Sequence, residues 1–256
     1  MKKRHHFIPE VIQKHFTSDP NKIFIWRFDK NLKIMTEISI KDNALEKHLY
    51  SYKNINGTNI TLIEDEFFAK IDYLYNNLIK MIEDRSPIEK IKGLVISIYS
   101  SLYSRVPKQI KNTTRMSQEL HDFQDKYNIN ENSFKEKDIK KGGLIGMFAL
   151  MDVHMHVMYN SNFKIFISNG DNFISCDNPA DGAHLPLTKK YCLLSSQEKY
   201  QTDYEEIDDQ FVGMINSWTY ENADNYIYGS WWSIMKTIVY IEKNINAPQI
   251  TLGHRV

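Results

Sequence analysis

The sequence predicts one α+β domain over residues 1–256, in which a mostly antiparallel sheet packs against a helical bundle. Runs rich in β-branched and aromatic residues, typical of strands, fall into an early group at 22–53 and a late group at 163–195. Between them, at about 61–160, apolar residues recur at spacings of three and four, as in helices. This order of strands, helices and strands favours an α+β fold whose two groups of strands share a sheet.

The early strands are expected at 22–29 and 33–40, joined as a hairpin, with a third short strand near 48–53. A long amphipathic helix follows over about 61–84. The next helix starts at Pro87, with Ser86 as its cap. It should end near Arg105, because Pro107 pushes Val106 away from helical geometry.

The second half of the chain is expected to begin with a polar helix at 108–127 and a charged connection at 128–139. The segment 142–160 is apolar on nearly every face, which predicts a buried helix. Late strands should cover 163–168, 173–179 and 191–196. Residues 205–242 return to helix-like periodicity.

Composition gives no electrostatic reason for a nucleic-acid or membrane partner, since 32 Lys and Arg balance 32 Asp and Glu. Cys176 and Cys192 are too few for a disulfide framework or a cysteine zinc site, so buried thiols in a reducing cytosol are expected. No apolar run reaches the length of a membrane span, and "MKKR" is not followed by the apolar stretch of a signal peptide. We therefore expect a cytoplasmic protein without a membrane partner.

Three histidines, His5, His6 and His15, lie within the first sixteen residues. Imidazole binds metals and changes charge near pH 7. Pro9 should begin a short helix through Phe16 that fixes His6 against the fold. The alternative is that His5 and His6 are terminal residues without a fixed position.

Further candidates lie on the apolar helix and at a strand end. Asp152 and His156 are four residues apart, on one helix face, and form either a buried pair or, with His6 and Asp177, a metal site. Asp177 ends a short strand before a turn, where it can act as a base, a ligand or a plain turn residue. Arg105 either complements the helix terminus or binds a phosphate.

The chain contains none of the common nucleotide-binding or esterase motifs. A glycine-rich phosphate loop, a GxSxG elbow and a CxxC pair are all missing from the sequence. This argues against P-loop ATPases, classical dehydrogenases and α/β-hydrolases. The aromatic-rich segment 218–232 can stack on bases or pack in the core, and packing is the commoner use.

Together, these motifs resemble the bacterial family called domain of unknown function 4238, over about residues 4 to 229. The segments that carry the resemblance are, in order, "RHHFIPEVIQKHF", "IFIWRFDK", "HLYSY", "SRVP", "FISCDNPA", "LPLTKKYCLL" and "INSWTYENADNYIYG". Position by position, the resemblance implies that His6, Arg105, Asp177, Pro179 and Asn216 occupy the family's motif positions. Because such a set shares no single packing explanation, it raises the expectation that His6, Arg105 and Asp177 act together.

The chain departs from the family pattern at Cys176, which replaces the usual serine before the aspartate and weakens any role for a hydroxyl there.

Two functional hypotheses follow. In the first, the protein is a hydrolase of a phosphate-containing substrate (RNA, DNA or a nucleotide), working as a toxin or anti-phage defence effector. His6 and Asp177 would supply acid–base groups or, with His156, ligands for a divalent metal, and Arg105 would hold the phosphate.

Asn178, Asn216 and His5 are the residues expected to contact that substrate. In the second hypothesis, the protein is a non-catalytic ligand-binding or sensor module. The His–Pro segment then packs onto the end of the Arg105 helix and onto the Asp177-Asn178-Pro179 turn to close the fold.

Overall fold

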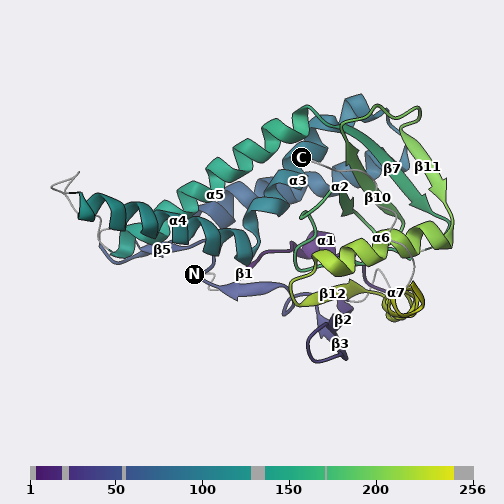
Figure 1. Cartoon of the computed structure of the whole chain (residues 1–256), viewed down its shortest axis with the longest axis horizontal. Helices are drawn as coiled ribbons and strands as arrows, with labels where there is room; N and C mark the ends of the chain where they lie inside the picture. Colours follow the sequence, from purple (N-terminus) through teal and green to yellow (C-terminus); the bar gives the residue numbers. More distant parts are fainter. Residues whose placement is uncertain (1–3, 19–22, 54–55, 128–135, 171, 245–256) are drawn as a thin grey trace.

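Two four-stranded sheets and a layer of long helices form the computed structural model, which describes residues 4–18, 23–53, 56–127, 136–170 and 172–244 (Figure 1). This mixed architecture confirms the α+β prediction. The long helices are α2 (Ala69–Glu83), α3 (Ile88–Arg105), α4 (Pro107–Lys126) and α5 (Glu136–Tyr159). In Figure 1, α4 and α5 extend beyond the sheets as an elongated arm.

The first sheet joins early and late parts of the chain, as expected from the sequence. Its strands, in the order β3-β2-β12-β8, are β3 (Ile34–Ser39), β2 (Phe24–Asp29), β12 (Tyr226–Gly229) and β8 (Ser175–Cys176). All three pairings are antiparallel, and Tyr228 of β12 lies between Arg27 and Ser175. Strand β12, from the late part of the chain, therefore holds the early hairpin to β8.

The second sheet consists of late strands only. Its strands, in the order β11-β7-β10-β9, are β11 (Tyr204–Ile207), β7 (Asn162–Ser168), β10 (Tyr191–Ser196) and β9 (His184–Pro186). β11 pairs parallel with β7, and the other two pairings are antiparallel. Helices α6 (Asp209–Asn222) and α7 (Trp231–Asn244) pack against each other beside the sheets (Figure 1).

Short N-terminal elements attach to the helical layer. β1 (Arg4–His6) pairs with β4 (Leu45–Lys47), and α1 (Glu10–Lys14) follows Pro9, as the sequence suggested. A second small pair joins β5 (Tyr52–Lys53) to β6 (Asn59–Ile60). Segment η1 (Ile63–Phe68) is a π-helical turn that leads into α2.

Several sequence predictions are wrong in detail. Of the single strand expected near 48–53, only β5 at Tyr52–Lys53 forms, because the backbone turns after β4 at His48, whose φ is +55°. Pro87, not Ser86, occupies the cap position of α3. The helical reading of 205–242 is interrupted by β11 and β12, whose pairing partners lie far away in the sequence. Of the connection expected at 128–139, residues 136–139 belong to α5, and 128–135 lie outside the described residues.

Helix α5 is not buried on every face. It packs against α3 and α4, and these two neighbours leave its remaining surface open. Val153 is 61% exposed and Tyr159 is 69% exposed. Although its sequence is mainly apolar, helix α5 is therefore only partly buried.

Glycines hold α5 close to α4. A Cβ atom on Gly143 would lie 2.8 Å from the Cα atom of Thr114, and one on Gly142 would lie 2.3 Å from the Oγ atom of Ser117. The Ser117 hydroxyl can rotate away from an added atom, but the Thr114 backbone cannot, so any other residue at Gly143 requires the helices to shift. Gly143 therefore fixes the spacing of the two helices in the arm.

The two cysteines, Cys176 and Cys192, are free thiols in the interior, as predicted. Within the residues described, no helix combines the length and apolar character needed to cross a membrane.

Candidate functional site

Arg105 is the largest completely buried side chain of the described structure, at the C-terminal end of α3. Its Nη1 atom donates to the Asp72 carboxylate at 2.7 Å, and its Nη2 atom donates to the backbone carbonyl of His6 at 3.0 Å. The Glu64 carboxylate lies 3.9 Å from Nη2, and the guanidinium lies 4.2 Å from the centre of the Phe68 ring. Arg105 therefore links the N-terminal strand to α2 and α3.

The surroundings keep this guanidinium charged. Burial by itself would lower the pKa of Arg105, but the carboxylate of Asp72, the Tyr50 phenol and the carboxylate of Glu64 together raise it above its ordinary value. Two carboxylates within 4 Å already balance the single positive charge. Arg105 is thus engaged by the protein itself and is not exposed to a phosphate in solution.

His5 and His6 are fixed residues, not frayed terminal ones. The His5 ring is fully buried, stacks on Tyr50 with 5.5 Å between ring centres, and its Nδ1 atom accepts the Tyr50 backbone N–H. The Nε2 atom of His6 lies 3.1 Å from the Ile40 carbonyl, and its Nδ1 atom lies 3.7 Å from the Glu10 carboxylate. Both imidazoles therefore attach β1 to the body of the fold.

Asp177 acts as a backbone clamp at the end of β8. Its two carboxylate oxygens accept the backbone N–H groups of Asp224, Asn225 and Tyr226 at 2.8–3.2 Å. Burial raises the pKa of Asp177 to about 6, although these hydrogen bonds act in the opposite direction. The partners of this carboxylate are separate from those of Arg105, so the expected convergence of Asp177 and Arg105 on one reacting group is not apparent.

Asn178 belongs to an adjoining polar turn. Its Nδ2 atom donates to the Asp181 carboxylate at 2.8 Å. Lys108, in the first turn of α4, lies 3.0 Å from the same carboxylate and 3.7 Å from that of Asp224. This ion-pair cluster joins the turn after β8 to the start of α4.

The acid and imidazole expected to pair on α5 lie on its open side. Asp152 and His156 are both exposed, so neither carries the desolvation cost that would force them together. It is the neighbouring His154 that packs inward, 4.3 Å from the Tyr103 ring, with its pKa lowered to about 4 by burial. The prediction of a buried pair is wrong because α5 is covered on one side only.

The predicted metal ligands do not assemble. No group of three or more His, Cys, Asp or Glu side chains within the described ranges could hold a metal ion, which includes His6, Asp177 and His156. The described residues therefore do not form the three-ligand metal site that the sequence suggested.

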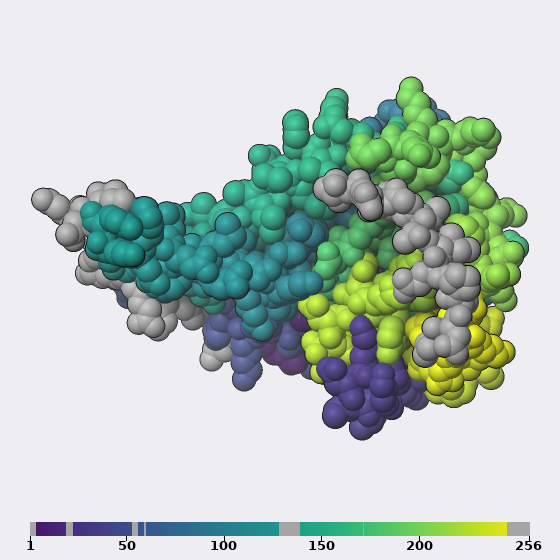
Figure 2. Space-filling view, in the orientation of Figure 1, coloured from purple at the N-terminus to yellow at the C-terminus, as the bar shows by residue number. Residues whose placement is uncertain are grey.

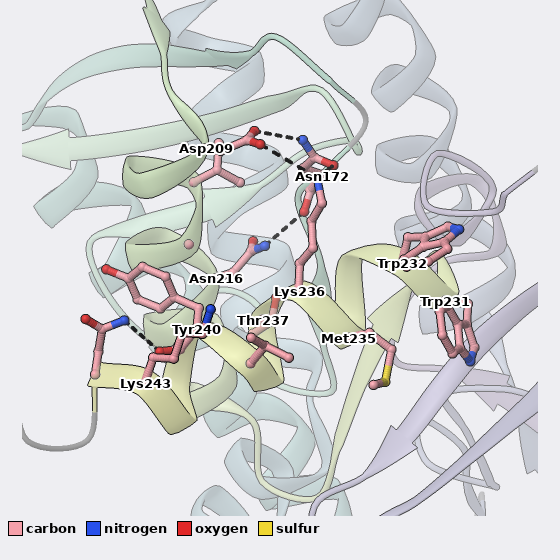
Figure 3. A pocket seen from close by; sticks show the side chains of 14 residues that line it. Asn172, Asp209, Asn216, Trp231, Trp232, Met235, Lys236, Thr237, Tyr240 and Lys243 are labelled. Atoms are coloured by element: carbon pink, nitrogen blue, oxygen red, sulfur yellow. Dashed lines mark hydrogen bonds and ion pairs between the residues drawn. The ribbon is translucent and has the colours of Figure 1, made fainter.

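Asn216, one of the predicted site residues, lines a sizeable cleft. This cleft of about 430 Å³ lies between α6, α7 and the loop that precedes β8 (Figure 3). The Asn216 side chain accepts the Ile174 backbone N–H at 3.2 Å and donates to the Asn172 carbonyl at 2.9 Å. It thus holds the loop that forms one wall.

A polar network continues along this wall. The Asn172 side chain donates to the Asp209 carboxylate at 3.2 Å, and Lys236 lies 3.7 Å from the same carboxylate. Lys236 also lies 3.4 Å from the Asn172 side-chain oxygen. These groups already hold one another, and the charge of Asp209 is offset by that of Lys236.

The remainder of the lining is mainly apolar. Trp231, Trp232 and Met235 lie at one end in Figure 3, and Tyr240 lies at the other. Tyr240 packs over Gly213, where a Cβ atom would come within 2.5 Å of its ring. Lys243 also lines the cleft, and no described carboxylate forms an ion pair with it.

The sequence reading missed the α7 contribution to this cleft. Trp232, Lys236, Val239 and Lys243 recur at spacings of four, three and four, which places them on one face of the helix. This mixture of aromatic and basic residues was the available signal. The aromatic-rich segment 218–232, interpreted as base stacking or core packing, ends at Trp232, and residues 233–243 were interpreted only as helix.

Comparisons with known proteins give a family but no described relative. Searches of the curated proteins and of the solved structures return no match. The family model described as "Protein of unknown function (DUF4238)" matches residues 4–231, nearly the whole chain. The protein therefore belongs to the DUF4238 family.

Proposed function

We propose that this protein is a ligand-binding module whose ligand is a small apolar molecule with one negative charge. The cleft between α6 and α7 is the observation that carries the proposal, since its volume of about 430 Å³ falls in the range of small-molecule sites. Its walls combine aromatic and aliphatic side chains with a few polar groups, which is the usual composition of such sites.

The charge of the ligand follows from the charged residues of the lining. The charged residues of the lining are Lys236, Lys243 and Asp209, and the ion pair of Lys236 with Asp209 leaves Lys243 available. A carboxylate or sulfonate on the ligand would balance that charge through a charge-assisted hydrogen bond. The apolar part of the ligand would then contact Trp231, Trp232 and Met235.

The geometry around Arg105 supports the binding hypothesis over the catalytic one. A guanidinium enclosed by Asp72 and Glu64 serves as a fold-closing contact, as the second sequence hypothesis expected. The hydrolase hypothesis, built on His6, Arg105 and Asp177, stays a prediction, and no contact described for these residues favours it.

A direct test uses anilinonaphthalene sulfonate, an apolar monoanion whose fluorescence rises in apolar sites. We expect saturable binding to the wild-type protein and competition by naphthoate, but not by the neutral naphthamide of similar shape. Met235→Trp should abolish binding by filling the cleft. Lys243→Gln should weaken it about tenfold, because a lost charge-assisted hydrogen bond is worth about 1.4 kcal/mol or more.

Lys199→Gln is the matched control, since Lys199 is exposed on the loop after β10 and does not line the cleft. Unchanged binding to Met235→Trp, or equal competition by the amide and the acid, would contradict the proposal.

A further inference from the structure

A continuous apolar stripe runs along the outer surface of α4. The side chains that form it, with their exposed fractions, are Met116 (63%), Leu120 (59%), Phe123 (51%) and Tyr127 (55%). Their spacings of four, three and four residues match the two core positions of a heptad repeat. We refer to these four residues as the α4 stripe.

No described residue of this chain buries the α4 stripe. Helix α5 packs on a neighbouring face of α4, where Thr113, Thr114 and Ser117 lie close to the glycines of α5. The stripe also lies on the elongated arm, which projects away from the two sheets (Figures 1 and 2). A second helix can therefore reach it without meeting the body of the molecule.

The charges beside the α4 stripe match a second copy of the same helix. Glu119 and Lys126 lie seven residues apart, on one edge of the stripe. In an antiparallel pair centred between Leu120 and Phe123, each Glu119 faces Lys126 of the second copy. A parallel pair would instead place Glu119 near Gln124 of the second copy, so the attraction between Glu119 and Lys126 would be lost.

An antiparallel pair with the same centre also brings the apolar residues of the two copies into contact. Leu120 meets Phe123 of the second copy, and Met116 meets Tyr127, so all four members of the stripe are covered in two symmetric pairs. Such a contact uses the same patch on both copies, as a two-fold dimer requires. The ion pair of Arg115 with Glu119 does not compete strongly, because both side chains are more than 60% exposed and 3.6 Å apart.

We propose that the α4 stripe is a homodimer interface in which two arms pair antiparallel and form a four-helix arrangement with their α5 partners. The contact involves one helix from each copy, which places it at the small end of specific interfaces. The dimer should therefore form and dissociate with protein concentration, and it would hold two α6–α7 clefts in one assembly.

Sedimentation velocity over a dilution series tests the proposal. We expect a two-chain mass at high concentration that falls to the one-chain mass on dilution. Leu120→Glu should remove the dimer at every concentration, because it buries a carboxylate in the apolar contact. Val153→Glu is the matched control, since Val153 is 61% exposed on α5, outside the stripe.

Charge reversal gives a second, independent test. Glu119→Lys should dissociate the dimer, since it places like charges opposite each other, and Glu119→Lys with Lys126→Glu should restore it. A one-chain mass at all concentrations of the wild type would overturn the proposal. So would a dimer that survives Leu120→Glu, or one that the double charge reversal does not restore.

Discussion

Replacing Arg105 by methionine separates the structural role of this residue from a catalytic one. Methionine keeps much of the length of the side chain but removes the charge that Asp72 and Glu64 share. The Arg105 side chain is 1% exposed and that of Glu64 is 7% exposed, so the loss leaves a buried carboxylate without its cation. Removal of one partner of a buried ion pair costs about 3–5 kcal/mol.

This cost can be measured by thermal unfolding followed by circular dichroism. For a chain of this length, 1 kcal/mol lowers the melting temperature by about 2–4 °C, so Arg105→Met should lower it by roughly 6–20 °C. Arg115→Met is the matched control, because the Arg115 side chain is 72% exposed, and it should melt within about 2 °C of the wild type.

A rescue experiment tests whether the lost stability comes from the uncompensated negative charge. Adding Asp72→Asn and Glu64→Gln to Arg105→Met should recover part of the lost stability, since neutral groups of the same shape remove the uncompensated charge. If Arg105→Met had the same melting temperature as the wild type, the structural role of Arg105 in linking β1 to α2 and α3 would be refuted. A catalytic role would then become the better explanation of its motif.

Two further predictions concern Asp177 and the helical arm. Burial raises the pKa of Asp177 from 3.8 to about 6, so the folded protein binds a proton more readily than the unfolded chain, and this residue should add stability as the pH falls from about 7 to 4. Urea denaturation at several pH values should show this gain in the wild type and not in Asp177→Asn; an unchanged pH dependence in the variant would contradict it. Gly143→Ala should cost about 1–3 kcal/mol in the same assay, because its Cβ atom would press on the Thr114 backbone. Gly93→Ala is its control, since nothing lies within 4 Å of the added atom, and equal stability of the two variants would contradict the close helix packing.

The helices could be predicted from the sequence more completely than the strands. The periodic apolar residues of α2 and α3, and the restriction imposed by Pro107, are local signals that act within one helix. Strand β12 has only four residues, and it is stabilised by pairing with β2 and β8. Because those partners are distant in the sequence, a local pattern could not reveal it.

In the candidate site, too, local sequence patterns predicted some features, whereas contacts between distant segments could not be predicted. Sequence motifs drew attention to His6, Arg105 and Asp177, but they could not supply the partners of these residues. Glu64 and Asp72 lie far from Arg105 in the sequence, and only folding brings them to it. The α6–α7 cleft depends on the packing of two helices, so no single segment of the sequence could predict it.

The position of β12 between β2 and β8 has a consequence for folding during synthesis. The β2–β3 hairpin leaves the ribosome early, but its sheet lacks a central strand until residues 226–229 are made. A two-stranded hairpin is marginally stable by itself, and contacts between distant segments form slowly. The β2–β3 hairpin therefore joins a complete sheet only after β12 has been made, and a nascent chain that stops before β12 exposes an open sheet edge to chaperones.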